Sequence, residues 1–224
     1  RSVALMLSLN RKIPRASWRT KDGNFSLHGL MGFDMHGKTA GIIGTGKIAK
    51  ILIHILKGFG MNILAYDLYP DYNFAREEKI VYTSLDELYH SSDIISLHCP
   101  LTEATKYLIN DYSISKMKDG VMIINTGRGQ LIHTNALIEG LKNKKIGSAG
   151  LDVYEEESEY FYEDQSDRII DDDVLARLLS FNNVIVTSHQ AFFTHEALEN
   201  IAMTTLQNIR DFINHKPLLN EVKK

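Results

Sequence analysis

The sequence feature that most constrains the fold is the stretch TAGIIGTGKIA at residues 39–49. Gly44 allows a tight turn after an apolar run, Gly46 lets the backbone approach a pyrophosphate, and Ala49 is small enough for a helix to pack on a sheet. The helix expected over residues 46–59 directs free amide groups and its positive dipole end toward phosphates. The stretch therefore predicts a strand, a glycine turn and a helix that bind a dinucleotide.

An acidic residue follows at the spacing that such a site needs. Asp67 comes directly after the apolar run of residues 62–66, where its carboxylate can accept both ribose hydroxyls of an adenosine. The same carboxylate repels a 2′-phosphate, so the sequence favours NAD over NADP. The alternative is a tight turn that binds nothing, and the spacing of Asp67 weighs against it.

Composition excludes several other classes of function. The chain has 224 residues, enough for one large domain or one and a half, and its net charge of −3 suggests neither a nucleic-acid nor a membrane partner. Cys99 is the only cysteine, which excludes a disulfide framework and a cysteine-based zinc site and fits a reducing cytoplasm. Its favoured role is that of a small buried residue. The histidines show no metal-ligand spacing, so no metal site is expected.

Seven short apolar, β-branched runs alternate with helical or turn-rich segments. This alternation is typical of a doubly wound parallel α/β sheet of the Rossmann type, with helices flanking it. The expected strands are residues 39–43, 62–66, 80–82, 93–97, 120–124, 146–151 and 184–187.

Helices are expected at both ends of the chain and within the sheet unit. Residues 1–20 should form one helix whose apolar face has no partner in a standard sheet unit. Residues 194–215 should form another that stops before Pro217. Both terminal helices are assigned to a second structural layer. Residues 133–143 space their apolar side chains for an amphipathic helix.

An arginine lies between two glycines after the apolar run of residues 121–124. Arg128 follows Thr126 and Gly127 at the carboxyl end of a predicted strand, which is the edge where open α/β sheets bind ligands. Its guanidinium could grip a carboxylate with two hydrogen bonds and polarise an adjacent carbonyl. The alternative is a surface arginine that caps a helix or forms an ion pair.

Two more loops follow predicted strands and carry titratable groups. Residues 150–157 include three consecutive glutamates, of which one could turn inward toward a histidine, although spacing does not say which. His189 lies at the end of the last predicted strand, where it can shuttle a proton. A neighbouring carboxylate would raise its pKa toward working pH. The alternative for one histidine among nine is a structural role.

Five motifs, taken together and in order, resemble those of the D-isomer-specific 2-hydroxyacid dehydrogenases. Within that family the fermentative D-lactate dehydrogenases are most similar, because of the acidic and aromatic stretch at residues 159–164 and the His-Gln-Ala-Phe sequence. The motifs are the glycine turn with Asp67, and residues 98–102, 125–129, 150–157 and 188–192.

The resemblance implies an NAD-dependent oxidoreductase that transfers a hydride between NADH and a small 2-keto acid, reducing pyruvate to D-lactate. The family's catalytic triad falls on Arg128, Glu157 and His189. Arg128 would bind the substrate carboxylate and polarise the keto oxygen. His189, held by Glu157, would donate the proton to that oxygen. Phe192 would shape the substrate pocket.

The resemblance also implies cofactor contacts along the carboxyl edge of the sheet and a homodimer packed through the cofactor domain. Its small-molecule partners would be a 2-keto acid and the corresponding 2-hydroxy acid. The implied NAD contacts are Gly44, Gly46, Lys47, Ile48, Asp67, Cys99, Pro100, Thr105, Thr126, Gly127 and Asp152.

The family's two α/β domains enclose a cleft, and this sequence matches mainly the cofactor half. Residues 1–190 would form the NAD-binding domain, with an interdomain helix at 1–20 and a Rossmann core at 37–189. Residues 191–224 would return to the substrate domain. Because most of the N-terminal substrate domain is expected to be missing, the alternative is a non-catalytic NAD-binding module or an inactive truncated remnant.

Overall fold

A computed structural model of the chain describes residues 1–156, 161–162, 164, 166–167 and 169–222. The chain divides into two compact units, Arg1–Ser188 and His189–Lys224. The first contains the whole sheet and is described first. Among the described residues, none of the helices is both long and apolar enough to span a membrane.

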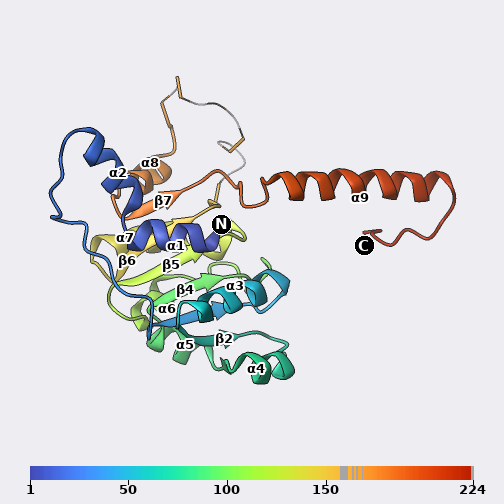
Figure 1. Cartoon of the computed structure of the whole chain (residues 1–224), viewed down its shortest axis with the longest axis horizontal. Helices are drawn as coiled ribbons and strands as arrows, with labels where there is room; N and C mark the ends of the chain where they lie inside the picture. The colour runs from blue at the N-terminus through green and yellow to red at the C-terminus, as the bar shows by residue number, and fades with distance from the viewer. Residues whose placement is uncertain (157–160, 163, 165, 168, 223–224) are drawn as a thin grey trace. The chain divides into compact units, whose positions relative to one another are not determined.

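Seven parallel strands form one sheet in the order β3-β2-β1-β4-β5-β6-β7 (Figure 1). The order reverses between β1 and β4, which leaves a crevice at their carboxyl ends. The doubly wound parallel fold and all seven predicted strand positions are confirmed. The strands are β1 (Thr39–Ile43), β2 (Asn62–Tyr66), β3 (Val81–Tyr82), β4 (Ile94–Leu97), β5 (Val121–Asn125), β6 (Ile146–Leu151) and β7 (Val184–Val186).

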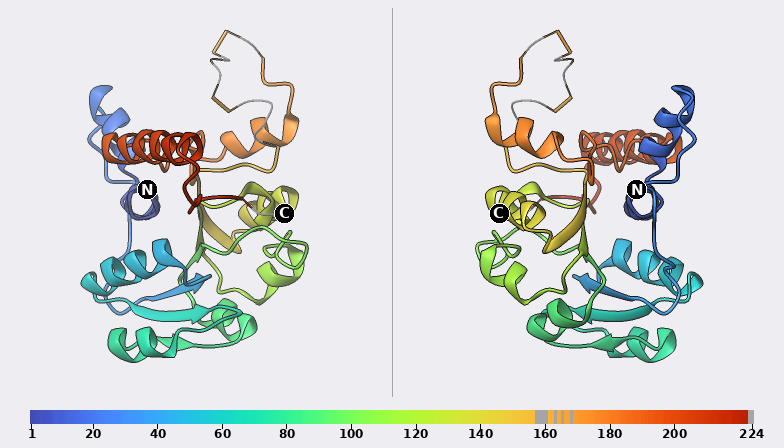
Figure 2. Two further views of the ribbon diagram at one scale, coloured as in Figure 1. Left: turned by 90° about the vertical axis from the view of Figure 1, so that its right-hand side faces the viewer. Right: turned by 90° about the vertical axis from the view of Figure 1, so that its left-hand side faces the viewer.

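Helices cover both faces of the sheet, with α1 and α3 on one side and α6 and α7 on the other (Figure 2). The predicted helix at 133–143 is confirmed as α7, and the one at 46–59 as α3. The helices of the first unit are α1 (Ser2–Asn10), α2 (Ile13–Lys21), α3 (Lys47–Gly58), α4 (Tyr72–Glu78), α5 (Leu85–Ser91), α6 (Asp111–Lys116), α7 (Thr134–Lys142) and α8 (Asp173–Leu179), with a short 3₁₀ turn at Gly129–Leu131.

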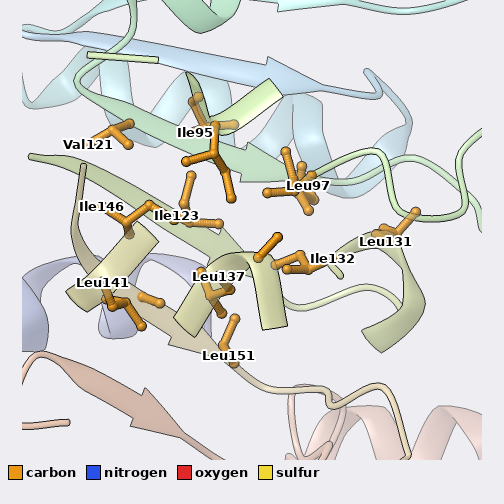
Figure 3. Packing of buried hydrophobic residues seen from close by; sticks show 14 of the residues in the cluster. Ile95, Leu97, Val121, Ile123, Leu131, Ile132, Leu137, Leu141, Ile146 and Leu151 are labelled. Carbon is orange, nitrogen blue, oxygen red and sulfur yellow. The ribbon is translucent and has the colours of Figure 1, made fainter. Parts of the chain in front are cut away.

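Two hydrophobic cores lie against the two faces of the sheet. In one, Leu137 and Leu141 of α7 belong to the same cluster as Ile123 of β5 (Figure 3). In the other, Ile53 of α3 packs with Ile42 of β1. Because the central strands are buried on both faces, their sequences are continuously apolar rather than alternating.

The predicted single helix over residues 1–20 is wrong, because the chain breaks into α1 and α2. Lys12 adopts a left-handed conformation with φ of 51° between them. Pro14 explains the break. It has no amide hydrogen for a continuous helix, but it fits the first turn of a new one, where no such hydrogen bond is needed.

The expectation that the first helix has no partner in the sheet unit is also wrong for α1. Leu5, Met6 and Leu9 are buried in the same core as α3. Gly150 of β6 makes room for them, since a Cβ there would lie 3.0 Å from Leu5 and from Leu9. By contrast, α2 has no buried residue.

The second unit consists mainly of α9 (His195–Ile213), which confirms the helix predicted over residues 194–215. The hydroxyl of Thr194 accepts a hydrogen bond from the amide of Ala197 at 3.2 Å and caps the helix. None of the residues of α9 is buried. The assignment of this segment to a substrate domain stays a prediction.

Candidate cofactor site

The glycine turn joins the carboxyl end of β1 to α3 and touches the neighbouring strand. Gly44 has φ of +90°, and a Cβ there would lie 2.5 Å from the amide nitrogen of Cys99. Only glycine satisfies both conditions. A Cβ on Gly46 would meet no atom within 4 Å, and Lys47 begins the helix directly afterwards. The start of α3 is therefore exposed, as phosphate binding requires.

Asp67 lies at the carboxyl end of β2, beside this turn. Its Oδ2 accepts hydrogen bonds from the amide of Thr45 at 2.6 Å and from the Thr45 hydroxyl at 2.9 Å. Its Oδ1 accepts from the amide of Tyr69 at 2.9 Å. Burial raises the pKa of Asp67, but these hydrogen bonds outweigh burial and hold it below its usual value. The group is therefore a fixed carboxylate at neutral pH.

A pocket of about 230 Å³ opens between the ends of β2 and β4. Its lining is mainly apolar, as suits a flat aromatic ring, with the Asp67 carboxylate among it. A larger hollow of about 540 Å³ lies between α6 and α7, away from the carboxyl edge of the sheet. The smaller pocket collects five residues of the predicted cofactor set, namely Gly44, Asp67, Cys99, Pro100 and Thr105.

Hydrogen bonds hold the wall of the pocket that follows β4. Thr105 donates its hydroxyl proton to the carbonyl of Pro100 at 2.7 Å and accepts from the amide of Thr102 at 2.8 Å. Cys99 is half-buried rather than fully buried, and burial raises the pKa of its thiol to about 11. Burial also lowers the pKa of the neighbouring His98 to about 4, so this ring is neutral at physiological pH. Its Nε2 lies 2.8 Å from the hydroxyl of Ser96.

The loop after β5 carries Arg128 with its side chain exposed. Asn125 shapes the loop, since its side chain donates to the carbonyl of Arg128 at 2.8 Å and accepts from the amide of Gly127 at 3.0 Å. The Arg128 guanidinium donates to the carbonyl of Gly127 at 2.8 Å. Thr126 pairs with the hydroxyl of Ser2 on α1 at 3.0 Å. None of the four belongs to the pocket beside Asp67.

Asp152 is fully buried at the carboxyl end of β6, outside that pocket. It accepts a hydrogen bond from the hydroxyl of Thr187, and the Arg1 guanidinium lies 3.9 Å away. It therefore ties the end of β6 to the residue that follows β7. A contact with NAD stays a prediction for this residue, as it does for every other residue of the predicted cofactor set.

The predicted catalytic residues fall in separate parts of the chain. Glu157 lies outside the described residues. His189, with φ of 48°, is the first residue of the second unit, whereas Arg128 belongs to the first. Phe192 also lies in the second unit, where its ring meets that of Phe193 at 6.1 Å. The roles of all four stay predictions.

Sequence reasoning missed several side chains that organise the site. The hydroxyl of Tyr82 donates to the hydroxyl of Thr45 at 2.8 Å, next to Asp67. Glu155 accepts hydrogen bonds from the hydroxyls of Tyr107 at 2.5 Å and Thr134 at 2.8 Å. Thr45 and Glu155 lie within motifs, but their partners are far away in the sequence and lie in none. Within the described residues, no group of His, Cys, Asp or Glu is placed to hold a metal ion.

Comparison with known proteins agrees with this geometry. The family model for the D-isomer specific 2-hydroxyacid dehydrogenase, NAD binding domain, matches residues 3–191. The D-lactate dehydrogenase of Escherichia coli (strain K12) is 52% identical over 221 residues, which cover 99% of this chain and 67% of that protein.

Two solved structures extend the comparison. The pyruvate reductase of Chlamydomonas reinhardtii has a TM-score of 0.94 and 46% identity, over 98% of this chain and 66% of its own. The D-lactate dehydrogenase of Aquifex aeolicus, solved with NAD and lactic acid, has a TM-score of 0.87 and 36% identity, over 96% of this chain and 65% of its own. This chain thus spans about two thirds of the length of the relatives it matches.

The glycine turn, the carboxylate of Asp67 and the apolar pocket fit a nicotinamide-adenine dinucleotide, and the family model covers the same residues. The chain therefore belongs to the D-isomer-specific 2-hydroxyacid dehydrogenases and contains their NAD-binding domain.

Proposed function

We propose that this chain acts in the NAD-dependent reduction of a small 2-keto acid, with pyruvate as substrate and D-lactate as product. The observation that carries the proposal is the pocket beside Asp67, where a fixed carboxylate adjoins the glycine turn in a domain of this family. The naming of relatives as D-lactate dehydrogenase and pyruvate reductase supports the choice of substrate.

The proposed chemistry divides between the cofactor and three side chains. Bound NADH supplies the hydride that reaches the keto carbon. Arg128 binds the substrate carboxylate with its guanidinium and polarises the keto oxygen. Protonated His189 donates a proton to that oxygen as negative charge develops on it. Glu157 stabilises the protonated ring through its negative charge. In lactate oxidation, neutral His189 accepts the proton.

Arg128→Ala tests the proposal. The variant should bind NADH as tightly as the unchanged protein, because Arg128 lies outside the pocket beside Asp67. Its kcat/KM for pyruvate should fall by at least about 100-fold, since a charge-assisted pair to the substrate is lost. The measurements are NADH fluorescence titration and pyruvate-dependent NADH oxidation. Arg76→Ala, on exposed α4, is the matched control.

The same assay separates the proposal from its alternative. Tight NADH binding without any pyruvate-dependent turnover by the unchanged chain would point to a non-catalytic NAD-binding module or an inactive remnant. Failure to bind NADH would overturn both.

We also propose that the chain forms a homodimer through its cofactor domain, in the cytoplasm. Helix α3 supports the dimer, because the helix is apolar on two sides. Leu52 and Leu56 are buried in the core, whereas Ile48, Ile51 and Ile55 are 73%, 65% and 40% exposed. An exposed apolar stripe at helical spacing suits packing against the same stripe of a second copy.

A further inference from the structure

Thr45 is the residue between the two glycines of the cofactor turn, and it is only 5% exposed. Its neighbour Gly46 is open to solvent. Thr45 turns inward because both its amide and its hydroxyl donate hydrogen bonds to Oδ2 of Asp67. Thr45, which the glycine motif leaves unspecified, thus donates two hydrogen bonds to Asp67, the residue expected to recognise the ribose.

The hydroxyl of Thr45 belongs to a chain of hydrogen bonds with one direction. A carboxylate can only accept, so the Thr45 hydroxyl must donate to Asp67. Its lone pairs are then free to accept, and Tyr82 of β3 donates its hydroxyl to them at 2.8 Å. The oxygen of Tyr82 accepts in turn from the amide of Asp71 at 3.2 Å. Every donor in this series of hydrogen bonds points toward the Asp67 carboxylate, and hydrogen bonds connected in this way strengthen one another.

Asp71 holds the end of this series of hydrogen bonds that lies farthest from Asp67. Asp71 caps α4 by accepting from the amide of Phe74 at 3.0 Å. It also accepts from the ammonium of Lys50 on α3 at 2.5 Å, and that ammonium lies 4.8 Å from the Phe74 ring centroid. Lys50 therefore pairs with Asp71 in this structure.

The hydrogen bonds also limit how Asp67 can receive a ligand. An ionised carboxylate offers about four acceptor positions; the two donors of Thr45 and the amide of Tyr69 take three of them, and the backbone of Leu68 also stabilises the charge. The carboxylate cannot rotate without breaking these bonds. Its negative charge is therefore held in a fixed place beside the glycine turn.

We propose that Thr45, oriented by Tyr82, is a positioning residue that fixes the Asp67 carboxylate and so sets the preference of this chain for NADH over NADPH. The proposal rests on the proposed ribose-recognition role of Asp67. A fixed carboxylate binds a ribose hydroxyl without first losing rotational freedom, and it cannot turn away from a 2′-phosphate. Without the hydroxyl of Thr45 the carboxylate can turn away from a 2′-phosphate, and the preference for NADH over NADPH falls.

Dissociation constants for NADH and NADPH, measured by fluorescence titration without substrate, test the proposal. In Thr45→Val, which keeps the shape and removes the hydroxyl, the ratio of the NADPH constant to the NADH constant should fall by about fivefold to tenfold. Thr45→Ser keeps the hydroxyl, so its ratio should stay within about twofold of that of the unchanged protein. Tyr82→Phe should lower it in the same direction by about twofold to threefold.

Two controls keep the outcome unambiguous. Tyr72→Phe removes a hydroxyl outside the chain of hydrogen bonds from a ring that packs against Tyr82 at 5.8 Å, and it should leave the ratio unchanged. Asp67→Ala should lower the ratio at least as far as Thr45→Val does. Thermal unfolding of each variant shows that it is folded, and Tyr82→Phe, which keeps the ring, carries the test if Thr45→Val does not fold.

The results separate the inference from the proposed function. If Asp67→Ala lowers the ratio while Thr45→Val and Tyr82→Phe leave it unchanged, the positioning role is wrong and the dehydrogenase proposal stands. If Asp67→Ala also leaves the ratio unchanged, Asp67 has no ribose role and the inference falls with it. Arg128-dependent turnover is measured separately and is not affected by either result.

Discussion

Gly129 places the Arg128 loop against the loop that leads toward Glu157. A Cβ at Gly129 would lie 1.9 Å from the carbonyl oxygen of Tyr154, and that oxygen belongs to the backbone, which cannot move aside as a flexible side chain would. The two loops thus share one close contact. The φ angle of Gly129 lies outside the left-handed region, so the backbone conformation does not require glycine here. The close contact with Tyr154 does.

Gly129→Ala should therefore lower the free energy of unfolding by about 1–3 kcal/mol, because one of the two loops must shift. Gly127→Ala is the matched control, two residues earlier in the same loop. Its nearest neighbour would be the side-chain oxygen of Asn125 at 3.6 Å, an ordinary contact, so its effect should stay below about 1 kcal/mol. Urea unfolding of both variants measures the difference, and equal effects would contradict the packing argument.

At the scale of elements, α1 and α2 differ in what they bury although they are adjacent in sequence. Met6 of α1 is 0% exposed, whereas Trp18 of α2 is 69% exposed. Met6→Ala should lower the free energy of unfolding by about 2–5 kcal/mol, as is usual for a large side chain removed from a core. Trp18→Ala should change it by no more than about 0.5 kcal/mol. Thermal or urea unfolding compares them, and a small effect of Met6→Ala would show that α1 is not part of the core.

The elements also show which parts of the fold a sequence can predict. Strands such as β1 and β5 are buried on both faces, so their apolar runs stand out and their positions were predictable. The place of α1 was not, because it depends on Gly150 of β6, far away in the chain, which leaves room for it. The break before α2 could have been predicted from Pro14 alone.

The site divides in the same way. Gly44 and Asp67 belong to one local motif, so their meeting at the edge of the sheet was predictable. The contact between Thr45 and Tyr82 was not, because it depends on the register that sets Tyr82 opposite Ala65 in the sheet. Arg128 and His189 are recognised by family resemblance alone, since they belong to two separate units of the chain.

For the whole molecule, the stripe of Ile48, Ile51 and Ile55 on α3 provides a test of self-association. Ile51→Glu should convert the proposed dimer to a monomer, because a charge would be buried without a partner at the contact. Leu179→Glu, 47% exposed on α8 at the other face of the sheet, introduces the same charge and should leave the dimer intact. Analytical ultracentrifugation gives the mass of each variant. If the protein without substitutions is a monomer, the proposed dimer is wrong.

The strand order has a consequence for how fast the first unit folds. Ile42 of β1 lies opposite Ala65 of β2 on one side and Ser96 of β4 on the other, so the centre of the sheet joins segments distant in the chain. Parallel pairing of this kind closes long loops before native contacts compensate for the lost chain entropy. Refolding should accordingly be slow for a chain of this size, and the glycine turn should form no earlier than the β1–β4 pairing that supports it.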